Sequence, residues 1–284
     1  MTNKLDGILF TGKLVFQSYG VKIGVRVNDR AAIAKIKNIL PFYSEILDEN
    51  HEADHNFSLV WGISEGGEGG EGVKGVEDAL YQENEEVARR VDPERLIALL
   101  DTCIRMAIGE FAPKHVFIHA SVVSWKDRAL IFPAKSYGGK TTLAAELIKY
   151  GAVYYSDEYA VIDEKGLAHP YPKPLSIRKE GEYTQTDRSV KDLGGEQGTR
   201  PIPVGMILLT QYERSAKWEP EMLSEGRGLM ELIPHSLAIG SNPEFVLKVL
   251  NLITKRAIIA KSKRGEVSQF AELLLNFADS RFFT

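Results

Sequence analysis

Residues 132–142 read FPAKSYGGKTT, and the predicted fold is built around this stretch. Two glycines stand directly before Lys140, and two hydroxyl residues follow it. An apolar run at 129–132 predicts a strand before the stretch, and an amphipathic run at 143–150 predicts a helix after it. A glycine-bearing loop between a strand and a helix is typical of phosphate binding.

The chemistry of such a loop assigns roles to its polar groups. Backbone N–H groups wrap a polyphosphate at the helix N-terminus, where the helix dipole favours negative charge. Lys140 would reach the outer phosphates, and the Thr141 hydroxyl would ligate Mg²⁺. The candidate nucleotide-binding residues of the loop are Ser136, Gly138, Gly139, Lys140, Thr141 and Thr142.

The loop departs from the usual pattern G-x-x-x-x-G-K-[ST], because Ala134 stands at the first position. The alternative interpretation is a glycine turn before an ordinary helix. The order of strand, loop and helix favours the phosphate-binding interpretation.

Charge and cysteine content argue against several classes of protein. A net charge of −4 and a pI near 5.9 give no electrostatic support for a nucleic-acid or membrane partner. The single cysteine, Cys103, leaves no internal disulfide and no cysteine-built zinc site. The first residues lack the plan of a signal peptide, and no apolar run approaches the ~20 residues of a membrane span. We therefore expect a cytoplasmic protein.

Residues 1–112 predict an accessory α/β unit that recognises the substrate. Strands are predicted at 5–10, 13–18, 21–27 and 57–61, with a helix capped by Asp29 that runs to about residue 40. Residues 80–90 are charged and predict an exposed strand or hairpin arm. Residues 63–75 are rich in glycine and glutamate, which predicts a flexible loop or hairpin tip.

Asp92, Pro93 and Glu94 predict the start of a helix that ends near Phe111. Its apolar residues share one face, and Asp101 and Arg105 are expected to point away from it. We place the domain boundary after this helix, so that residues 113–284 form the nucleotide-binding domain.

The second domain opens with HVFIHA at 115–120, a predicted buried strand, and a hairpin around residues 125–127 that leads into the loop. Asp157 and Glu158 follow Lys140 by 17 and 18 residues, between predicted strands at 152–155 and 160–162. Acids beside a phosphate loop can hold Mg²⁺ or accept a hydroxyl proton.

Each of these residues also has an ordinary structural interpretation. An acidic pair in a β-turn is usually solvated, and a histidine in an apolar strand, such as His119, is usually a satisfied core residue. The loop, the short helix and the returning strand together favour a functional role for Asp157.

The run His119…AKSYGGKTT…Ser156-Asp157-Glu158 resembles the C-terminal domain of HPr kinase/phosphorylase and the wider HPr kinase-like family, which is related to phosphoenolpyruvate carboxykinase. Three motifs match in order: the histidine-bearing strand, the phosphate loop, and the acidic pair after a short helix. The resemblance covers residues 115–168 well and the later helices more loosely. It does not extend to the N-terminal unit.

The resemblance implies an HPr kinase-like P-loop core, with a mixed α+β sheet and C-terminal helices, that uses ATP and Mg²⁺. It assigns Asp157 as the base that takes a proton from an acceptor hydroxyl. His119 would lie close to the reacting phosphate, and Lys140 would bind that phosphate as a catalytic residue. Metal contacts would come from Thr141, Asp157 and Glu158, and Arg178 would contact phosphate or substrate.

Departures from the family qualify these roles. The family loop begins with glycine and an acid where this chain has Ala134 and Lys135, and it often has glycine where Tyr137 stands. Loop geometry or nucleotide affinity would then differ. The segment typical of the phosphorylase reaction is not recognisable, which puts that activity and HPr as substrate in doubt.

The remaining sequence predicts scaffold. We expect a mobile loop at 184–198, a buried strand at 203–211, helices at 226–234, 242–255 and 267–277, and an edge strand at 257–260. A homo-oligomer is expected only by analogy.

The predicted function is transfer of the ATP γ-phosphate to a hydroxyl of a protein, peptide or small molecule. The alternative is a nucleotide-binding regulatory or assembly module that carries out no transfer.

Overall fold

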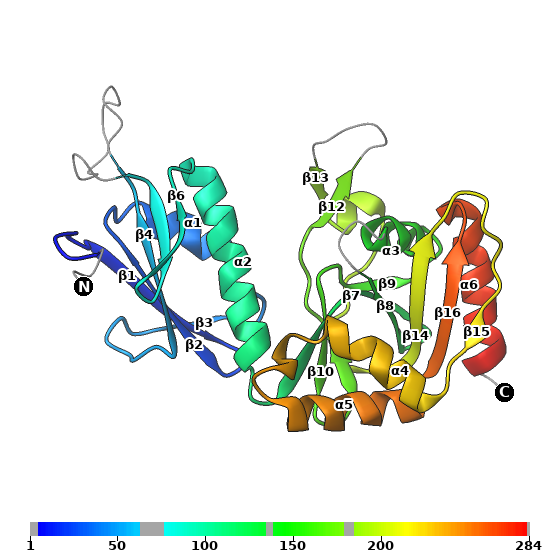
Figure 1. The fold of residues 1–284 in the computed structure, drawn as a ribbon. Helices are drawn as coiled ribbons and strands as arrows, with labels where there is room; N and C mark the ends of the chain where they lie inside the picture. Colours follow the sequence, from blue (N-terminus) through cyan, green and yellow to red (C-terminus); the bar gives the residue numbers. More distant parts are fainter. Residues whose placement is uncertain (1–4, 63–76, 135–138, 179–184, 283–284) are drawn as a thin grey trace. The chain divides into compact units, whose positions relative to one another are not determined.

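The chain consists of two compact units, and the computed structural model describes residues 5–62, 77–134, 139–178 and 185–282 (Figure 1). The N-terminal unit is Met1–Pro113 and the C-terminal unit is Lys114–Thr284, so the division lies one residue from the expected boundary. Each unit combines helices with a mixed sheet, and the described residues form six α-helices in all. The chain is therefore a mixed α/β protein with mixed sheets.

The N-terminal unit contains a six-stranded sheet with the order β3-β1-β2-β4-β5-β6. Its first two strands form a tight hairpin, because Tyr19 and Gly20 both adopt positive φ at the turn. The strands are β1 (Gly12–Ser18), β2 (Val21–Val27), β3 (Glu45–Leu47), β4 (His55–Val60), β5 (Ala79–Gln82) and β6 (Glu85–Arg89).

Two helices belong to this unit, α1 (Ala32–Asn38) and α2 (Pro93–Phe111). Helix α2 begins where the sequence predicts, because the Asp92 side chain accepts a hydrogen bond from the Arg95 amide at 2.9 Å. The expectation for Arg105 is wrong: it is buried and pairs with Asp101 at 2.6 Å. The long arginine stem packs against neighbours while its guanidinium keeps a carboxylate partner.

Two further expectations for this unit concern residues 5–10 and 63–75. The predicted strand at 5–10 is wrong: Gly7 adopts a left-handed φ of 92°, so residues 5–7 form a turn and residues 8–10 have irregular backbone. The stretch 63–75, predicted as a flexible loop, lies outside the described residues.

The C-terminal unit is built on an eight-stranded sheet with the order β11-β10-β7-β8-β14-β16-β15, in which β9 also pairs with β7. Strands β8, β14 and β16 run parallel to one another, and β11 pairs with both β10 and β14, so the sheet curls back on itself. The strands are β7 (His115–Trp125), β8 (Arg128–Pro133), β9 (Val153–Ser156), β10 (Tyr159–Asp163), β11 (Leu167–His169), β14 (Ile202–Tyr212), β15 (Glu221–Met222) and β16 (Ile258–Arg264).

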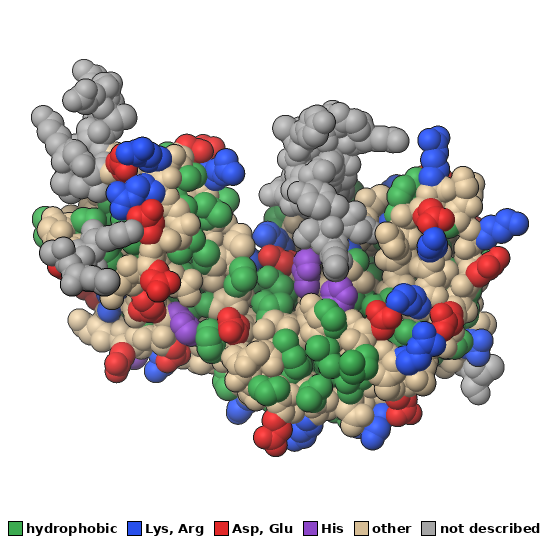
Figure 2. All heavy atoms as spheres, viewed as in Figure 1, with side chains coloured by type: hydrophobic (Ala, Val, Ile, Leu, Met, Phe, Trp, Pro, Cys, Tyr) green, Lys and Arg blue, Asp and Glu red, His purple; other side chains and the backbone are tan. Residues whose placement is uncertain are grey.

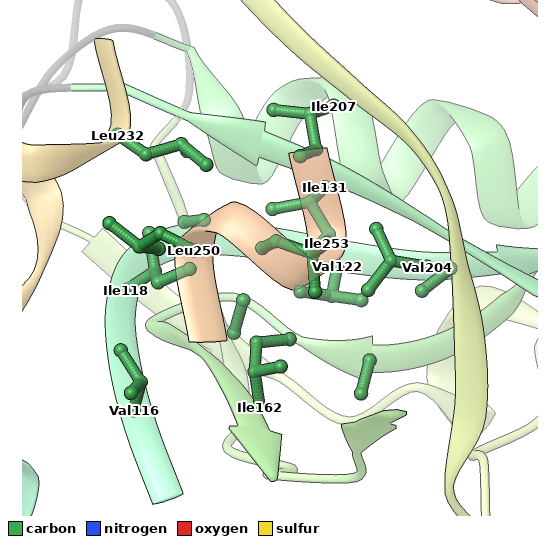
Figure 3. Packing of buried hydrophobic residues seen from close by; sticks show 14 of the residues in the cluster. Val116, Ile118, Val122, Ile131, Ile162, Val204, Ile207, Leu232, Leu250 and Ile253 are labelled. Atoms are coloured by element: carbon green, nitrogen blue, oxygen red, sulfur yellow. The ribbon is translucent and has the colours of Figure 1, made fainter. Parts of the chain in front are cut away.

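Helices cover both faces of this sheet. One face packs against α4 (Glu225–Leu232) and α5 (Pro243–Arg256), with Leu232, Leu250 and Ile253 meeting strand residues in the cluster of Figure 3. The opposite face packs against α3 (Lys140–Lys149) and α6 (Val267–Phe282). Because α3 starts where β8 ends, the candidate loop is held at the carboxyl end of a buried strand.

Two expectations for the later sequence need correction. The segment predicted as an edge strand at 257–260 is the start of β16, which lies between β14 and β15 and is paired on both sides. The predicted loop at 184–198 contains β13 (Gln185–Arg188), which pairs with β12 (Leu175–Arg178), and a 3₁₀ turn at Lys191–Leu193; residue 184 lies outside the described residues.

The surface over α4 and α5 is partly apolar, and Figure 2 shows a group of hydrophobic side chains there. Met230 and Leu247 are among the exposed members. Within the described residues, no helix combines the length and apolar character that crossing a bilayer requires.

Candidate functional site

The last residue of the candidate loop is Gly139, which forms the N-cap of α3. Its φ of 75° is left-handed, a conformation that a residue with a Cβ rarely adopts. Its carbonyl accepts the Leu143 amide at 3.1 Å and so begins the helix. Residues 135–138 lie outside the described residues, and with them the candidates Ser136 and Gly138.

Lys140 is the first residue of α3 and is only partly exposed. Its ammonium donates to the Ala134 carbonyl at 2.7 Å and lies 3.3 Å from His119 Nε2. An ammonium can only donate, so His119 Nε2 is the acceptor and the ring proton lies on Nδ1. The structure therefore brings the predicted Lys140 and His119 together from α3 and β7.

The protonation states follow from burial. Burial lowers the pKa of His119 to about 4, and the nearby Lys140 and His235 act in the same direction. Burial also lowers the pKa of Lys140, while the negative charge of Asp157 opposes that shift. A neutral histidine beside a cation can accept a hydrogen bond or orient a ligand without adding a second positive charge.

Asp157 lies at a break between two collinear strands. Strands β9 and β10 both pair antiparallel with β7, at 122–124 and 115–119 respectively, and the short turn of Asp157 and Glu158 interrupts them. The buried Ser156 hydroxyl stabilises this turn by accepting the amides of Glu158 and Tyr159 at 3.2 and 3.1 Å. The turn aims Asp157 at the first turn of α3, where the Thr141 hydroxyl donates to its Oδ2 at 2.6 Å.

The environment of Asp157 is unusual for a carboxylate. Burial raises its pKa to about 6, although the Thr141 hydroxyl, the Lys140 ammonium and the Ser121 hydroxyl favour the charged form; Glu158 adds to the rise. Its Oδ1 is buried and accepts no hydrogen bond of ordinary geometry from the described residues; the Ser121 hydroxyl lies near enough to favour the charged carboxylate without forming one. A buried acceptor without a donor is costly, which indicates a missing ligand or proton at this atom.

The other predicted residues occupy different surroundings. Glu158 directs its Oε2 toward the Lys173 ammonium at 3.3 Å. Thr142 is exposed on α3. Arg178 ends β12, and its side chain lies outside the description.

A divalent metal can be tested against these oxygens. Mg²⁺ prefers carboxylate and hydroxyl oxygen ligands together with phosphates and water. Thr141 Oγ1 and the Asp157 carboxylate lie side by side, and Asp157 Oδ1 offers an uncommitted oxygen among the described residues, so this pair fits the ion.

A cavity of about 790 Å³ opens at the carboxyl ends of β8, β14 and β16. Ligands of open α/β sheets commonly bind at the carboxyl ends of parallel strands. The cavity reaches the start of the candidate loop at Pro133 and Ala134, and its other lining residues are Leu209, Thr210, Gln211, Tyr212, Glu219, Glu221, Glu231, His235, Lys261, Ser262 and Lys263.

Two residues at this site were not expected from sequence. His235 stands in no sequence pattern that suggests a metal site, so a structural or surface residue is expected there; it lines the cavity and lowers the pKa of His119. Arg264 is buried at the end of β16 and donates to the Gly139 carbonyl at 3.1 Å. A lone arginine at the end of a strand carries no sequence signal for this contact, since the two residues are 125 positions apart.

No protein-family model matches the sequence, and no curated protein matches it significantly. The functional interpretation therefore depends on the residues and their geometry.

Proposed function

We propose that the C-terminal unit binds ATP through the loop before α3 and transfers its γ-phosphate to a hydroxyl group, as an HPr kinase-like P-loop protein. The observation that carries this proposal is the position of Asp157. Its carboxylate contacts Thr141 in the first turn of α3, lies near Lys140 and keeps one buried oxygen without a donor among the described residues.

The α3 N-terminus supports phosphate binding. Its first backbone N–H groups and its dipole favour an anion, and Lys140 adds a partly buried positive charge to the same place. Lys140 donates to the Ala134 carbonyl and lies against neutral His119. A phosphate oxygen is a stronger acceptor for an ammonium than these neutral groups, so it can compete with them for Lys140.

Asp157 supports transfer in addition to binding. The acceptor hydroxyl would pass its proton to the Asp157 carboxylate while its oxygen forms a bond to the γ-phosphorus. The bond between the γ-phosphorus and the bridging oxygen then breaks, and ADP leaves with that electron pair. A carboxyl pKa near 6 suits this base, because it is mostly ionised at neutral pH and still basic enough to accept a proton.

Mg²⁺ bound by Thr141 and Asp157 would neutralise charge on the phosphates. The cavity beside Ala134 offers room for the part of the nucleotide or acceptor that extends from the loop. Contacts in this cavity would then select which hydroxyl compound is the acceptor.

The first experiment measures binding. We would titrate Mg²⁺-ATP into the wild type, Lys140→Ala, Asp157→Asn and Lys149→Ala while recording melting temperatures. Lys149 is the matched control, since it lies on the same helix but is exposed and pairs with Glu146. We expect ATP to raise the melting temperature of the wild type, Asp157→Asn and Lys149→Ala but not of Lys140→Ala.

The second experiment separates a kinase from a binding module. Phosphorus NMR would follow ADP formation with free serine, serine-containing peptides and a hexose as acceptors. ADP formation by the wild type and its loss in Asp157→Asn, with binding retained, would support transfer. Binding without acceptor-dependent ADP would favour the regulatory module, and the absence of any ATP effect on wild-type melting would refute the nucleotide site.

A further inference from the structure

Arg264 is a buried cation at the edge of the candidate phosphate site. It ends β16 with only 2% of its surface exposed, and it pairs in register with Tyr212 of the parallel strand β14. Side chains along a strand point alternately to its two faces, so residues 260, 262 and 264 share one face. This is the face that packs against α3 and α6, because Ala260 belongs to that core. The position of Arg264 at the end of β16 therefore places its guanidinium beside Gly139, at the N-terminus of α3.

Within the described part of the chain, the hydrogen bonds of Arg264 are all to uncharged groups. Nη2 donates to the Gly139 carbonyl at 3.1 Å, and Nη1 donates weakly to the Gly265 carbonyl at 3.4 Å. The Tyr212 ring lies 5.5 Å from the guanidinium carbon, and Nε has no acceptor among the described residues. Glu266 contributes a long-range attraction, but it accepts the Tyr212 hydroxyl at 2.8 Å and forms no ion pair with Arg264.

This arrangement is costly in the unliganded protein. A buried charge without a counter-charge loses hydration that neutral carbonyl oxygens replace only in part. Arginine does not relieve the cost by losing its proton, because its pKa lies far above neutral even when burial lowers it. The positive charge lies beside the N-cap of a ten-residue helix whose N-terminus also favours an anion.

We propose that Arg264 is a positioning residue for a bound polyphosphate: it fixes the end of the loop through Gly139 and supplies a buried positive charge that the phosphates compensate. The inference rests on the proposed function, because it requires phosphates to bind at the α3 N-terminus. The contact is close because residue 139 is glycine: a Cβ there would displace Arg264 Nη2.

The test uses inorganic tripolyphosphate with Mg²⁺, which presents the phosphates without the nucleoside. Calorimetry would give the dissociation constant, and melting curves without ligand would give stability, for the wild type, Arg264→Met, Arg264→Gln and Arg264→Lys. Arg256→Met is the matched control: it makes the same change in net charge at an exposed residue before the opposite end of β16.

We expect Arg264→Met and Arg264→Gln to bind tripolyphosphate about 10- to 100-fold more weakly, the range of a lost charge-assisted contact. Arg264→Lys should recover part of the affinity, and Arg256→Met should bind like the wild type. The unliganded melting temperature of Arg264→Met should equal or exceed that of the wild type, since the substitution removes an uncompensated charge.

An unchanged dissociation constant in Arg264→Met, together with a lower unliganded melting temperature, would overturn the inference and leave Arg264 as a structural residue. If Arg264→Met does not fold, Arg264→Gln decides by the same constant, because glutamine removes the charge but keeps a polar group that can form hydrogen bonds. A wild type that binds neither Mg²⁺-tripolyphosphate nor Mg²⁺-ATP would refute the proposed function as well. Tight wild-type binding with unaffected Arg264 variants would refute this inference alone.

Discussion

Replacing Asp157 by asparagine is expected to stabilise the unliganded protein at neutral pH and to have little effect on its stability in acid. The folded-state pKa of this carboxyl is raised from 3.8 to about 6, chiefly by burial. The folded protein therefore holds a proton at this site that the unfolded chain has already lost. As pH rises from about 4 to 6, the wild type loses stability, because the buried carboxyl must ionise.

The size of the effect follows from the shift. At about 1.4 kcal/mol per pKa unit, a rise from 3.8 to about 6 corresponds to about 3 kcal/mol of lost stability above pH 6. Asparagine has the same shape, keeps an oxygen for the Thr141 hydroxyl and does not ionise. The free energy of unfolding of Asp157→Asn should therefore exceed that of the wild type by about 3 kcal/mol at pH 7.5 and by almost nothing near pH 3.5.

Urea unfolding followed by fluorescence measures this difference, because Trp125 and Trp218 lie in the same unit as Asp157. Asp163 supplies a control of opposite sign. Burial raises its pKa, but hydrogen bonds from His169 and two backbone amides outweigh that effect and the net pKa is lowered. Asp163→Asn should therefore lose stability at neutral pH, and the loss should disappear as pH falls below the unfolded pKa.

The reasoning would be refuted by a stability difference between Asp157→Asn and the wild type that stays constant from pH 3.5 to 7.5. Such a result would mean that the carboxyl is well solvated in the folded protein. It would then have an ordinary acidity, and the argument that it is a base matched to neutral pH would fail.

Three further predictions test other parts of the structure. Burial lowers the pKa of His119 to about 4, so the wild type should lose stability as pH falls from about 6.5 to 4, and His119→Gln should lose less over that range in urea unfolding. Gly139→Ala should lower the free energy of unfolding by about 2 kcal/mol or more, because the left-handed φ and the contact with Arg264 both oppose a Cβ. Gly151→Ala is the control: its φ is also left-handed, at 91°, but a Cβ there would meet no neighbouring atom, so urea unfolding should show a loss of only about 1 kcal/mol. Asp92→Ala should cost about 1 kcal/mol and speed hydrogen exchange of the first turn of α2.

Local sequence determined the elements whose signals are local. Asp92 and Pro93 begin α2 because a side-chain acceptor and a fixed φ act within one turn, and the helix ends at Phe111 as predicted. The same holds for α3, which begins beside Gly139. The apolar residues at 5–10 were insufficient to predict a strand, since a strand also needs a neighbour to accept its hydrogen bonds.

The candidate site shows the same division. The sequence by itself singled out Lys140, Thr141 and Asp157, because glycine before a helix and an acid after a short return are patterns within one stretch of chain. Only the tertiary structure decided that Thr141 donates to Asp157 and that Arg264 reaches Gly139 across 125 residues. Those contacts depend on strand order and register, which set side-chain distances through pairing between remote segments and leave no local trace in the sequence.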